Sequence, residues 1–152
     1  MKKSYSLLWS VMLVLALITS ACKKDKPKPL SERIAKAWTA ESVKEGSAVV
    51  YTRGGSTNTK PAYSSFRLNL TNASGTKTVS YTEFDGNTFT GTWDLEGETT
   101  LVLSGLTPQP TSSGGTLKFT INTIADAALT LTRITASPKT GNTINEYKLT
   151  NP

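Results

Sequence analysis

Thr88-Phe89-Thr90-Gly91-Thr92-Trp93-Asp94-Leu95 is the stretch of sequence that decides the fold. Its large apolar residues, Phe89, Trp93 and Leu95, share one phase of a two-residue repeat, and the threonines occupy the other phase. Successive side chains of a β-strand point to opposite faces of its sheet, so a two-residue repeat gives one apolar and one polar face. This stretch therefore predicts a strand that buries one face and exposes the other to water.

The same alternation recurs along most of the chain. The predicted strands are 38–44, 47–52, 63–71, 77–84, 88–95, 99–105, 116–124, 128–136 and 143–150. The apolar phase slips between Leu131 and Ile134, which predicts a β-bulge. One short helix is expected before the strands, with Ser31 as its N-cap, Glu32 in its first turn and its end near Ala37.

The connections between these strands are short and rich in turn-forming residues, as in Asp85-Gly86-Asn87 and Lys139-Thr140-Gly141-Asn142. Short connections make neighbouring strands antiparallel, which is typical of a barrel or a sandwich. A meander that closes on itself leaves no free edge. We therefore expect an all-β fold, an antiparallel meander barrel of eight or nine strands, with segments 54–62 and 107–115 as loops at its rim.

The N-terminus has the features of an export signal. Lys2 and Lys3 precede an apolar stretch over residues 7–18, and Ser20 and Ala21 stand directly before Cys22, the only cysteine. This arrangement resembles the lipobox of bacterial lipoproteins. The resemblance implies a signal peptide over 1–21, cleavage before Cys22, acyl chains such as palmitate on its thiol, and a lipid anchor in a membrane. An ordinary cleaved signal and an uncleaved membrane helix are the alternatives, but the apolar stretch is shorter than the roughly 20 residues that span a bilayer.

The basic charge is concentrated near the predicted anchor. The formal net charge is +6, but the lysines of residues 1–28 carry most of it, and residues 29–152 are close to neutral. We therefore expect no nucleic-acid partner. Residues 22–29 are expected to form a Lys- and Pro-rich tether beside anionic headgroups, followed by one domain over 30–152. Lys23, where inner-membrane lipoproteins have Asp, favours the outer membrane, and the absence of an acidic run favours the periplasmic face.

Residues 30–150 resemble the short lipocalin-like lipoproteins of Bacteroidetes. The resemblance rests on the helical turn, the first strand beginning at Trp38, the meander of short strands, and Arg133 late in the chain. Lys36 stands where the family motif Gly-x-Trp has its glycine. The resemblance implies that Trp38 closes one end of the barrel and that Arg133 packs across it.

The chain lacks the residues that most enzymes use. It contains no histidine, and its single cysteine is the predicted lipidation site, which argues against triads, thiolate catalysis and His metal sites. The acids Glu83, Asp85, Asp94, Glu96 and Glu98 are interpreted as solvated surface charge, with a calcium-binding turn and paired catalytic carboxylates as the alternatives. We therefore expect a protein that is not an enzyme and has neither a metal nor a cofactor.

The aromatic residues leave two functions open. Tyr81, Trp93 and Tyr147 lie on the apolar phase and carry a hydroxyl or an indole N–H, so they are the candidates for lining a pocket for a small apolar ligand. In the alternative, the interior is packed and the protein is a structural or glycan-contacting accessory lipoprotein, with Tyr63 and Phe84 as an exposed platform for sugars.

Overall fold

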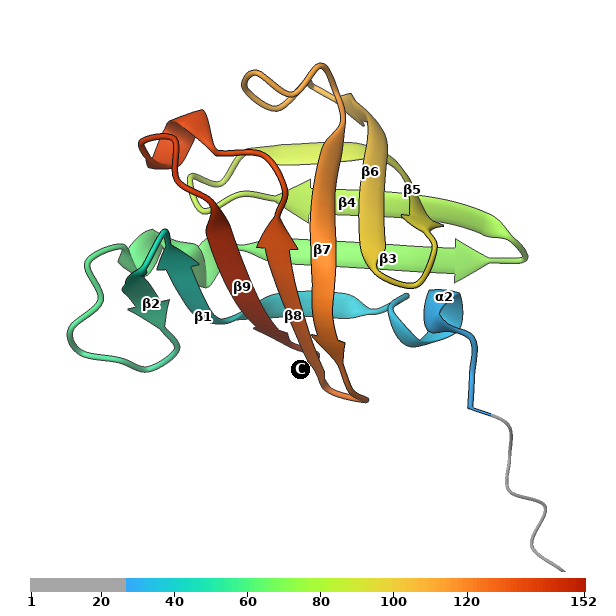
Figure 1. Cartoon of the computed structure of the whole chain (residues 1–152), viewed down its shortest axis with the longest axis horizontal. Coiled ribbons are helices and arrows are strands. Elements are labelled where there is room, and N and C mark those ends of the chain that lie inside the picture. Colours follow the sequence, from blue (N-terminus) through green and yellow to red (C-terminus); the bar gives the residue numbers. More distant parts are fainter. Residues whose placement is uncertain (1–26) are drawn as a thin grey trace, which may run out of the picture.

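The computed structural model describes residues 27–152 (Figure 1). The predicted signal peptide 1–21, the lipidation site Cys22 and the tether up to residue 26 lie outside the described residues. Within the part that is described, no helix has both the length and the apolar character needed to cross a bilayer.

Nine strands make up most of residues 27–152. They are β1 (Ala37–Glu45), β2 (Ala48–Thr52), β3 (Arg67–Ala73), β4 (Thr76–Thr82), β5 (Thr88–Glu96), β6 (Thr100–Thr107), β7 (Leu117–Ile124), β8 (Ala128–Arg133) and β9 (Asn145–Thr150). Three short helical segments accompany them: α2 (Leu30–Arg33), η1 (Pro61–Ser65) and η2 (Pro138–Thr140).

The strands form a closed antiparallel barrel, as predicted. From β3 to β9 each strand pairs with the next along the chain, and β1 pairs with both β3 and β9. The first residues of β1 face β3 and its last residues face β2. β2 therefore forms a hairpin with the end of β1 and lies outside the closed ring of eight strands (Figure 1).

The interior is formed by the apolar phase of the strands. In β5, Phe89 and Trp93 are buried, whereas Thr88, Thr90 and Thr92 are exposed. Buried leucines from β3, β6, β7, β8 and β9 join them in one continuous core. The alternation in the sequence therefore predicted which residues enter the barrel.

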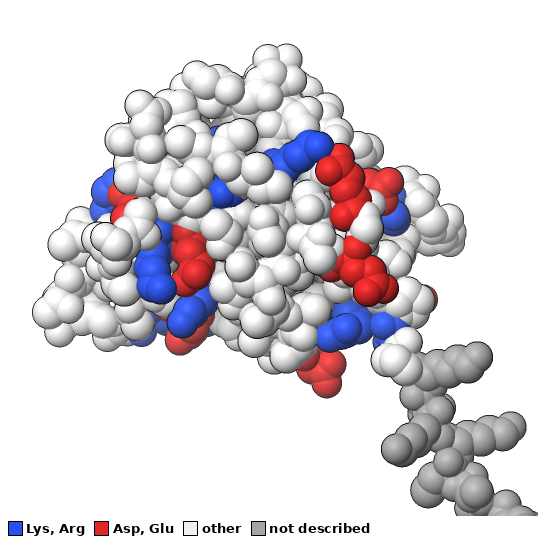
Figure 2. All heavy atoms as spheres, viewed as in Figure 1, with Lys and Arg blue, Asp and Glu red and all other residues white. Residues whose placement is uncertain are grey.

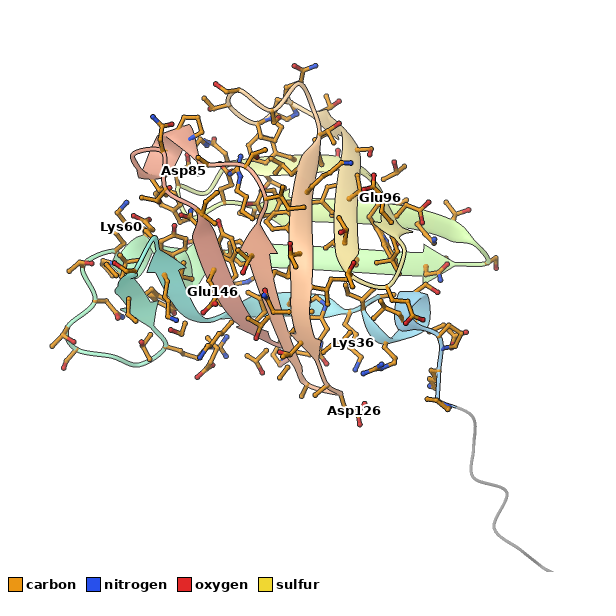
Figure 3. The ribbon with its side chains drawn as sticks, in the orientation of Figure 1. Lys36, Lys60, Asp85, Glu96, Asp126 and Glu146 are labelled. Carbon is orange, nitrogen blue, oxygen red and sulfur yellow. The ribbon has the colours of Figure 1, made fainter. Side chains whose placement is uncertain are left out.

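The two ends of the barrel differ, and we name them by what covers them. The helix end carries α2 and the turns 74–75, 97–99 and 125–127. The loop end carries η1, the turn 83–87, the loop 108–116, and the loop 134–144 that contains η2. Lys36 and Asp126 lie at the helix end, and Asp85 and Lys60 lie at the loop end (Figure 3).

Three local predictions need correction. The helix spans Leu30–Arg33 and its N-cap is Pro29 with no side-chain cap, so Ser31 is inside the helix. Tyr63 lies in η1, because Pro61 begins a 3-10 turn there, and β3 starts only at Arg67. The phase slip before Ile134 marks the end of β8 at Arg133, and the nearby irregularity in pairing falls between Ile121 and Thr123 of β7.

Candidate functional site

The loop end of the barrel gathers polar side chains inside an otherwise apolar core. Tyr81 from β4, Arg133 from β8 and Tyr147 from β9 are all less than 5% exposed. Glu83 and Asn145 are also buried at this end. We call these five residues the polar end of the barrel. The structure thus places two of the three predicted ligand-binding residues, Tyr81 and Tyr147, on the same barrel end.

Aromatic rings from opposite strands pack against one another at this level. Phe66, at the end of η1 and directly before β3, stacks on Tyr147 with ring centroids 5.0 Å apart. Phe119 of β7 makes edge contacts with Tyr81 at 6.3 Å and with Tyr147 at 6.1 Å. Such pairs stabilise a core beyond the area that they bury, by about 0.5–1.5 kcal/mol each. The interior here is filled largely by rings, with polar atoms at their tips.

The amide of Asn145 holds the Tyr147 hydroxyl in place. Its Nδ2 donates to the Tyr147 hydroxyl oxygen at 3.3 Å. Its Oδ1 accepts from the hydroxyls of Thr143 at 2.8 Å and Thr140 at 3.2 Å. Because Thr140 belongs to η2, this network connects the loop 134–144 to the barrel interior.

Lys139 connects the same loop to the turn between β4 and β5. Its Nζ lies 2.5 Å from a carboxylate oxygen of the buried Glu83 and 2.7 Å from one of Asp85. Burial alone would raise the pKa of the Asp85 carboxyl, but hydrogen bonds from Lys139 and Asn87 outweigh it and lower that pKa. Burial likewise opposes the charge on Lys139, yet its two carboxylate partners raise its pKa. We call Glu83, Asp85 and Lys139 the lysine latch.

Arg133 has no such partner. Its side chain is 96% buried, and its Nε is sealed from solvent without a hydrogen-bond partner. Among residues 27–152 its side chain makes neither a salt bridge nor a hydrogen bond, whereas the carboxylate of Glu83, the buried acid of this part of the chain, pairs with Lys139. A charged group buried without a partner is costly.

Three of the buried tyrosines, Tyr63, Tyr81 and Tyr147, are held in their neutral form. Burial is the largest cause that raises the pKa values of Tyr63, Tyr81 and Tyr147. The positive charge of Arg133 acts in the opposite direction on the pKa values of Tyr81 and Tyr147. The Tyr63 hydroxyl donates to Glu45 Oε1 at 2.8 Å. These hydroxyls can therefore donate hydrogen bonds at neutral pH.

Trp38, the predicted closing residue, and Trp93, the third predicted ligand-binding residue, both lie toward the helix end. Trp38 is fully buried and its Nε1 donates to the carbonyl oxygen of Ile34 at 2.8 Å, which fixes α2 over the barrel. Trp93 is 2% exposed, and its Nε1 donates to the Thr71 carbonyl at 2.8 Å. Trp93 points inward and its neighbour Thr92 outward, but it is not part of the polar end.

The expected stack of Arg133 on Trp38 is corrected by the strand register. Ala40 faces Leu149, which in turn faces Leu129. Along β1, Trp38 lies on the helix-end side of Ala40. Along β8, Arg133 lies four residues after Leu129, toward the loop end. The cation over the Trp38 ring is Lys36, at 5.9 Å from the ring centroid. Trp38 thus closes its end together with α2, and Arg133 belongs to the other end.

The proposed sugar platform of Tyr63 and Phe84 is also corrected. Tyr63 is 1% exposed, because η1 turns it into the barrel beside Phe84 at 4.8 Å between ring centroids. Lys60 lies over the outer side of Phe84, with its Nζ 5.5 Å from the ring centroid. Neither ring presents a free flat face.

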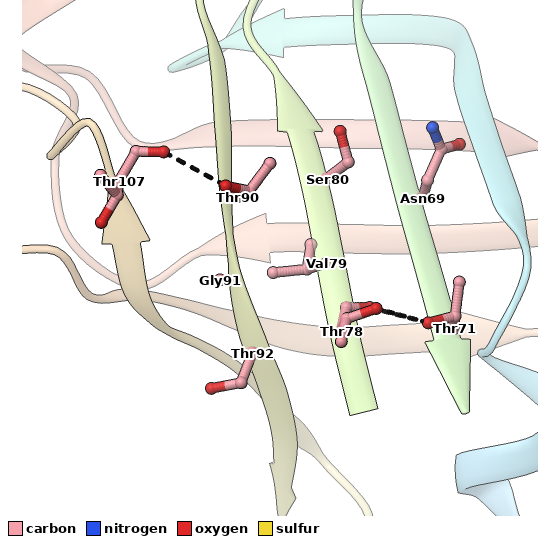
Figure 4. A pocket seen from close by; sticks show the side chains of 9 residues that line it. All are labelled: Asn69, Thr71, Thr78, Val79, Ser80, Thr90, Gly91, Thr92 and Thr107. Carbon is pink, nitrogen blue, oxygen red and sulfur yellow. Dashed lines mark hydrogen bonds between the residues drawn. The ribbon is translucent and has the colours of Figure 1, made fainter. Parts of the chain in front are cut away.

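A groove of about 570 Å³ lies on the outer surface of the barrel. It crosses β3, β4, β5 and the end of β6, and its lining contains no charged side chain (Figure 4). The lining residues include Asn69, Thr71, Thr78, Ser80, Thr90, Thr92 and Thr107. In the sequence, Thr90 and Thr92 indicate only a solvated strand face, because a flat polar face and a shallow groove share the same alternation.

The acids are dispersed and paired with lysines. Asp94 lies 2.5 Å from Lys77 and Glu96 lies 2.6 Å from Lys118. On the face shown in Figure 2, acidic and basic side chains lie next to one another. In residues 27–152, no group of three or more His, Cys, Asp or Glu side chains is placed to hold a metal ion.

Comparison with known proteins supports the fold. No protein-family model matches the chain, and no curated protein matches it. Its structure is similar to the crystal structure of a lipocalin-like protein from Bacteroides uniformis, with a TM-score of 0.50 and 14% sequence identity. The similarity covers 79% of this chain and 99% of that one. The domain therefore has a lipocalin-like fold.

Proposed function

We propose that this protein is a lipid-anchored cell-envelope protein whose barrel binds a small, mainly apolar ligand at the polar end. The observation that carries the proposal is the group of buried polar residues at one end of an apolar interior. Binding sites for small molecules combine apolar walls with a few converging polar groups. Lipocalin-like folds are typically used for binding rather than catalysis, which agrees with this assignment.

The anchor would hold the barrel in a defined orientation. Pro27–Pro29 lead directly into α2 at the helix end. If Cys22 is lipidated, the helix end faces the membrane. We propose that this is the outer membrane, with the domain on its periplasmic side. The polar end then faces away from the lipid, where a ligand from the aqueous space would reach it.

The anchor is tested by replacing its single acylated residue. Cys22→Ser should abolish incorporation of labelled fatty acid and release the protein from membranes after a high-salt wash. The wash is needed because the lysines near Cys22 attract anionic headgroups on their own. Retention of the washed variant on membranes would contradict lipid anchoring.

Ligand binding is tested with full-length protein in lipid nanodiscs. Octanoate and octan-1-ol are titrated by calorimetry, with empty nanodiscs as the blank. Saturable binding of either probe supports the proposal, and Tyr81→Phe should weaken it because one buried hydroxyl is lost. Thr82→Val, one residue along on the outer face of β4, is the matched control and should leave binding unchanged. No saturable binding of either probe would refute the proposed ligand site.

A second candidate function is an accessory role with contact to neutral glycans. The packing of Phe66, Phe119 and Tyr147 favours a filled interior, and the outer groove offers uncharged hydroxyls. Binding to an array of neutral oligosaccharides that is lost in Thr78→Val and Thr90→Val, with Thr120→Val on β7 as the control, would support this role.

A further inference from the structure

We infer that the ligand of the polar end carries a carboxylate, and that the Arg133 guanidinium binds it. This inference rests on the proposed function, because it names the chemistry of the ligand at the same site. The starting point is the position of Arg133 as the last residue of β8, opposite Phe119 of β7, with its side chain inside the barrel.

The burial of Arg133 needs an explanation. At 4% exposure the guanidinium has lost most of its hydration, yet its Nε lacks a hydrogen-bond partner. Buried polar groups in folded proteins nearly always have partners, and an exception points to a water, an ion or a ligand that the protein chain does not itself supply. The missing partner should be an anion, because Arg has five N–H donors, no acceptor and a permanent charge.

The acidic side chains at this end of the barrel are paired with lysines. Glu83 is the buried acid at this end of the barrel, and its carboxylate lies on Lys139 at 2.5 Å. Asp85 is held by the same lysine, and Glu45 is held by Lys60 at 2.7 Å and by the Tyr63 hydroxyl. The described residues therefore give Arg133 no carboxylate in direct contact.

The surroundings of Arg133 fit a carboxylate with an apolar body. A planar guanidinium matches a carboxylate through two parallel hydrogen bonds. Tyr81 and Tyr147 are buried at the same end of the barrel and would supply further neutral hydrogen-bond donors to such a ligand. The rings of Phe66 and Phe119 pack against these tyrosines, so the surroundings of this end are mainly apolar. We therefore favour an organic carboxylate over an inorganic anion.

The test compares probes that differ only in the headgroup or in the apolar chain. Octanoate, octan-1-ol and acetate are titrated against the full-length protein in lipid nanodiscs. Octanoate should bind roughly 10- to 100-fold more tightly than octan-1-ol, the ratio expected from one charge-assisted hydrogen-bonded pair. Acetate should bind more weakly than octanoate, because it lacks the apolar chain. If acetate binds as tightly as octanoate, the site takes a free small anion, and the inference that the ligand is a carboxylate with an apolar body is contradicted.

Two variants isolate the role of Arg133. Arg133→Met keeps the length of the side chain and removes its charge, so octanoate should bind no better than octan-1-ol. A buried charge without a partner is removed as well, so the thermal midpoint of the ligand-free protein should not fall. Arg133→Lys keeps the charge but not the planar fork, so octanoate binding should weaken while octan-1-ol binding stays unchanged.

The outcomes separate this inference from the proposed function. Equal affinity of the unmodified protein for octanoate and octan-1-ol would contradict a carboxylate ligand, but it would not contradict the proposed ligand site. Unchanged preference for octanoate in both variants would overturn the role of Arg133. Absence of saturable binding by all probes would refute the ligand site itself and indicate that water satisfies Arg133.

Discussion

Gly91 of β5 lies so close to β6 that a Cβ atom built on it would be 2.5 Å from the carbonyl oxygen of Ser104. The contact occurs where the pairing of β5 with β6 shifts between Thr90 and Thr92. Gly105 has a φ of +61° at the same place. The irregular pairing of β5 with β6 at this point, beside the outer groove, thus depends on the absence of a side chain at Gly91.

The close approach predicts that Gly91→Ala is destabilising. Because the clashing atom belongs to the backbone, strands must move apart, at a cost of about 1–3 kcal/mol in the free energy of unfolding. Urea denaturation followed by circular dichroism measures this cost. Thr92→Ser on the exposed face is the control, and we expect it to stay within about 0.5 kcal/mol. An equally stable Gly91→Ala protein would show that β6 does not approach this closely.

Trp38 and Arg133 are predicted to act independently. Trp38→Phe removes the indole donor to the Ile34 carbonyl, which still accepts from the Lys36 backbone N–H, so the lost hydrogen bond should cost about 0.5–1.5 kcal/mol. Because Arg133 lies at the other end of the barrel, the effects of Trp38→Phe and Arg133→Leu should add within about 0.3–0.5 kcal/mol. A double-mutant cycle on the unfolding free energy measures this. Coupling well above that margin would place the two side chains in contact.

The lysine latch should stabilise the protein over a defined pH range. The pKa of Asp85 is lowered from 3.8, so its contribution is present above that value and is lost as the pH falls through the lower native pKa. The pKa of Lys139 is raised from 10.5, so its contribution is present below that value and is lost as the pH rises through the higher native pKa.

Lys139→Met tests this range. At neutral pH it leaves the buried Glu83 carboxylate without its partner, which should cost about 1–3 kcal/mol. The stability difference from the unmodified protein should shrink as the pH falls below about 4. Lys148→Met, an exposed lysine on β9, serves as the control with a small effect at every pH. A difference that does not depend on pH in acid would exclude the latch.

The buried tyrosines should resist ionisation. Since the pKa values of Tyr63, Tyr81 and Tyr147 are raised above 10.0, the folded state keeps protons that the unfolded state releases. Stability is therefore undiminished below pH 10 and falls as the pH rises further. Phenolate absorbance should appear in one step with unfolding, and Tyr147→Phe should reduce the amplitude of that step. Gradual ionisation of all tyrosines before unfolding would contradict this.

The sequence allowed the strands and the interior face to be predicted because alternation is a local property. Phe89 and Trp93 enter the barrel for the same reason that Thr90 and Thr92 do not. The end of the barrel at which a residue lies is not local, since it depends on the direction of each strand and on its register with its neighbours. Arg133 was therefore assigned to Trp38 by resemblance, although β8 carries it to the other end.

Side chains from irregular segments were the least predictable. Lys139 and Tyr63 complete the surroundings of the polar end, yet each lies in a 3-10 segment that begins with a proline and has no repeat to indicate its direction. Pro61, the first residue of η1, was the signal in the sequence that could have separated η1 from β3. Nothing in the pattern of single residues indicates that Lys139 reaches Glu83, more than fifty positions earlier.

The closure of the barrel has a consequence for how the chain folds. Ala40 of β1 faces Leu149 of β9, so the pairing that completes the ring joins two of the most distant parts of the domain. Such non-local pairings slow folding, because closing a long loop costs conformational entropy before the stabilising contacts can form. Until β9 emerges during synthesis, one edge of β1 has no partner and can pair with other extended chains. A chaperone that covers this edge would therefore matter more to this protein than to one whose contacts are local.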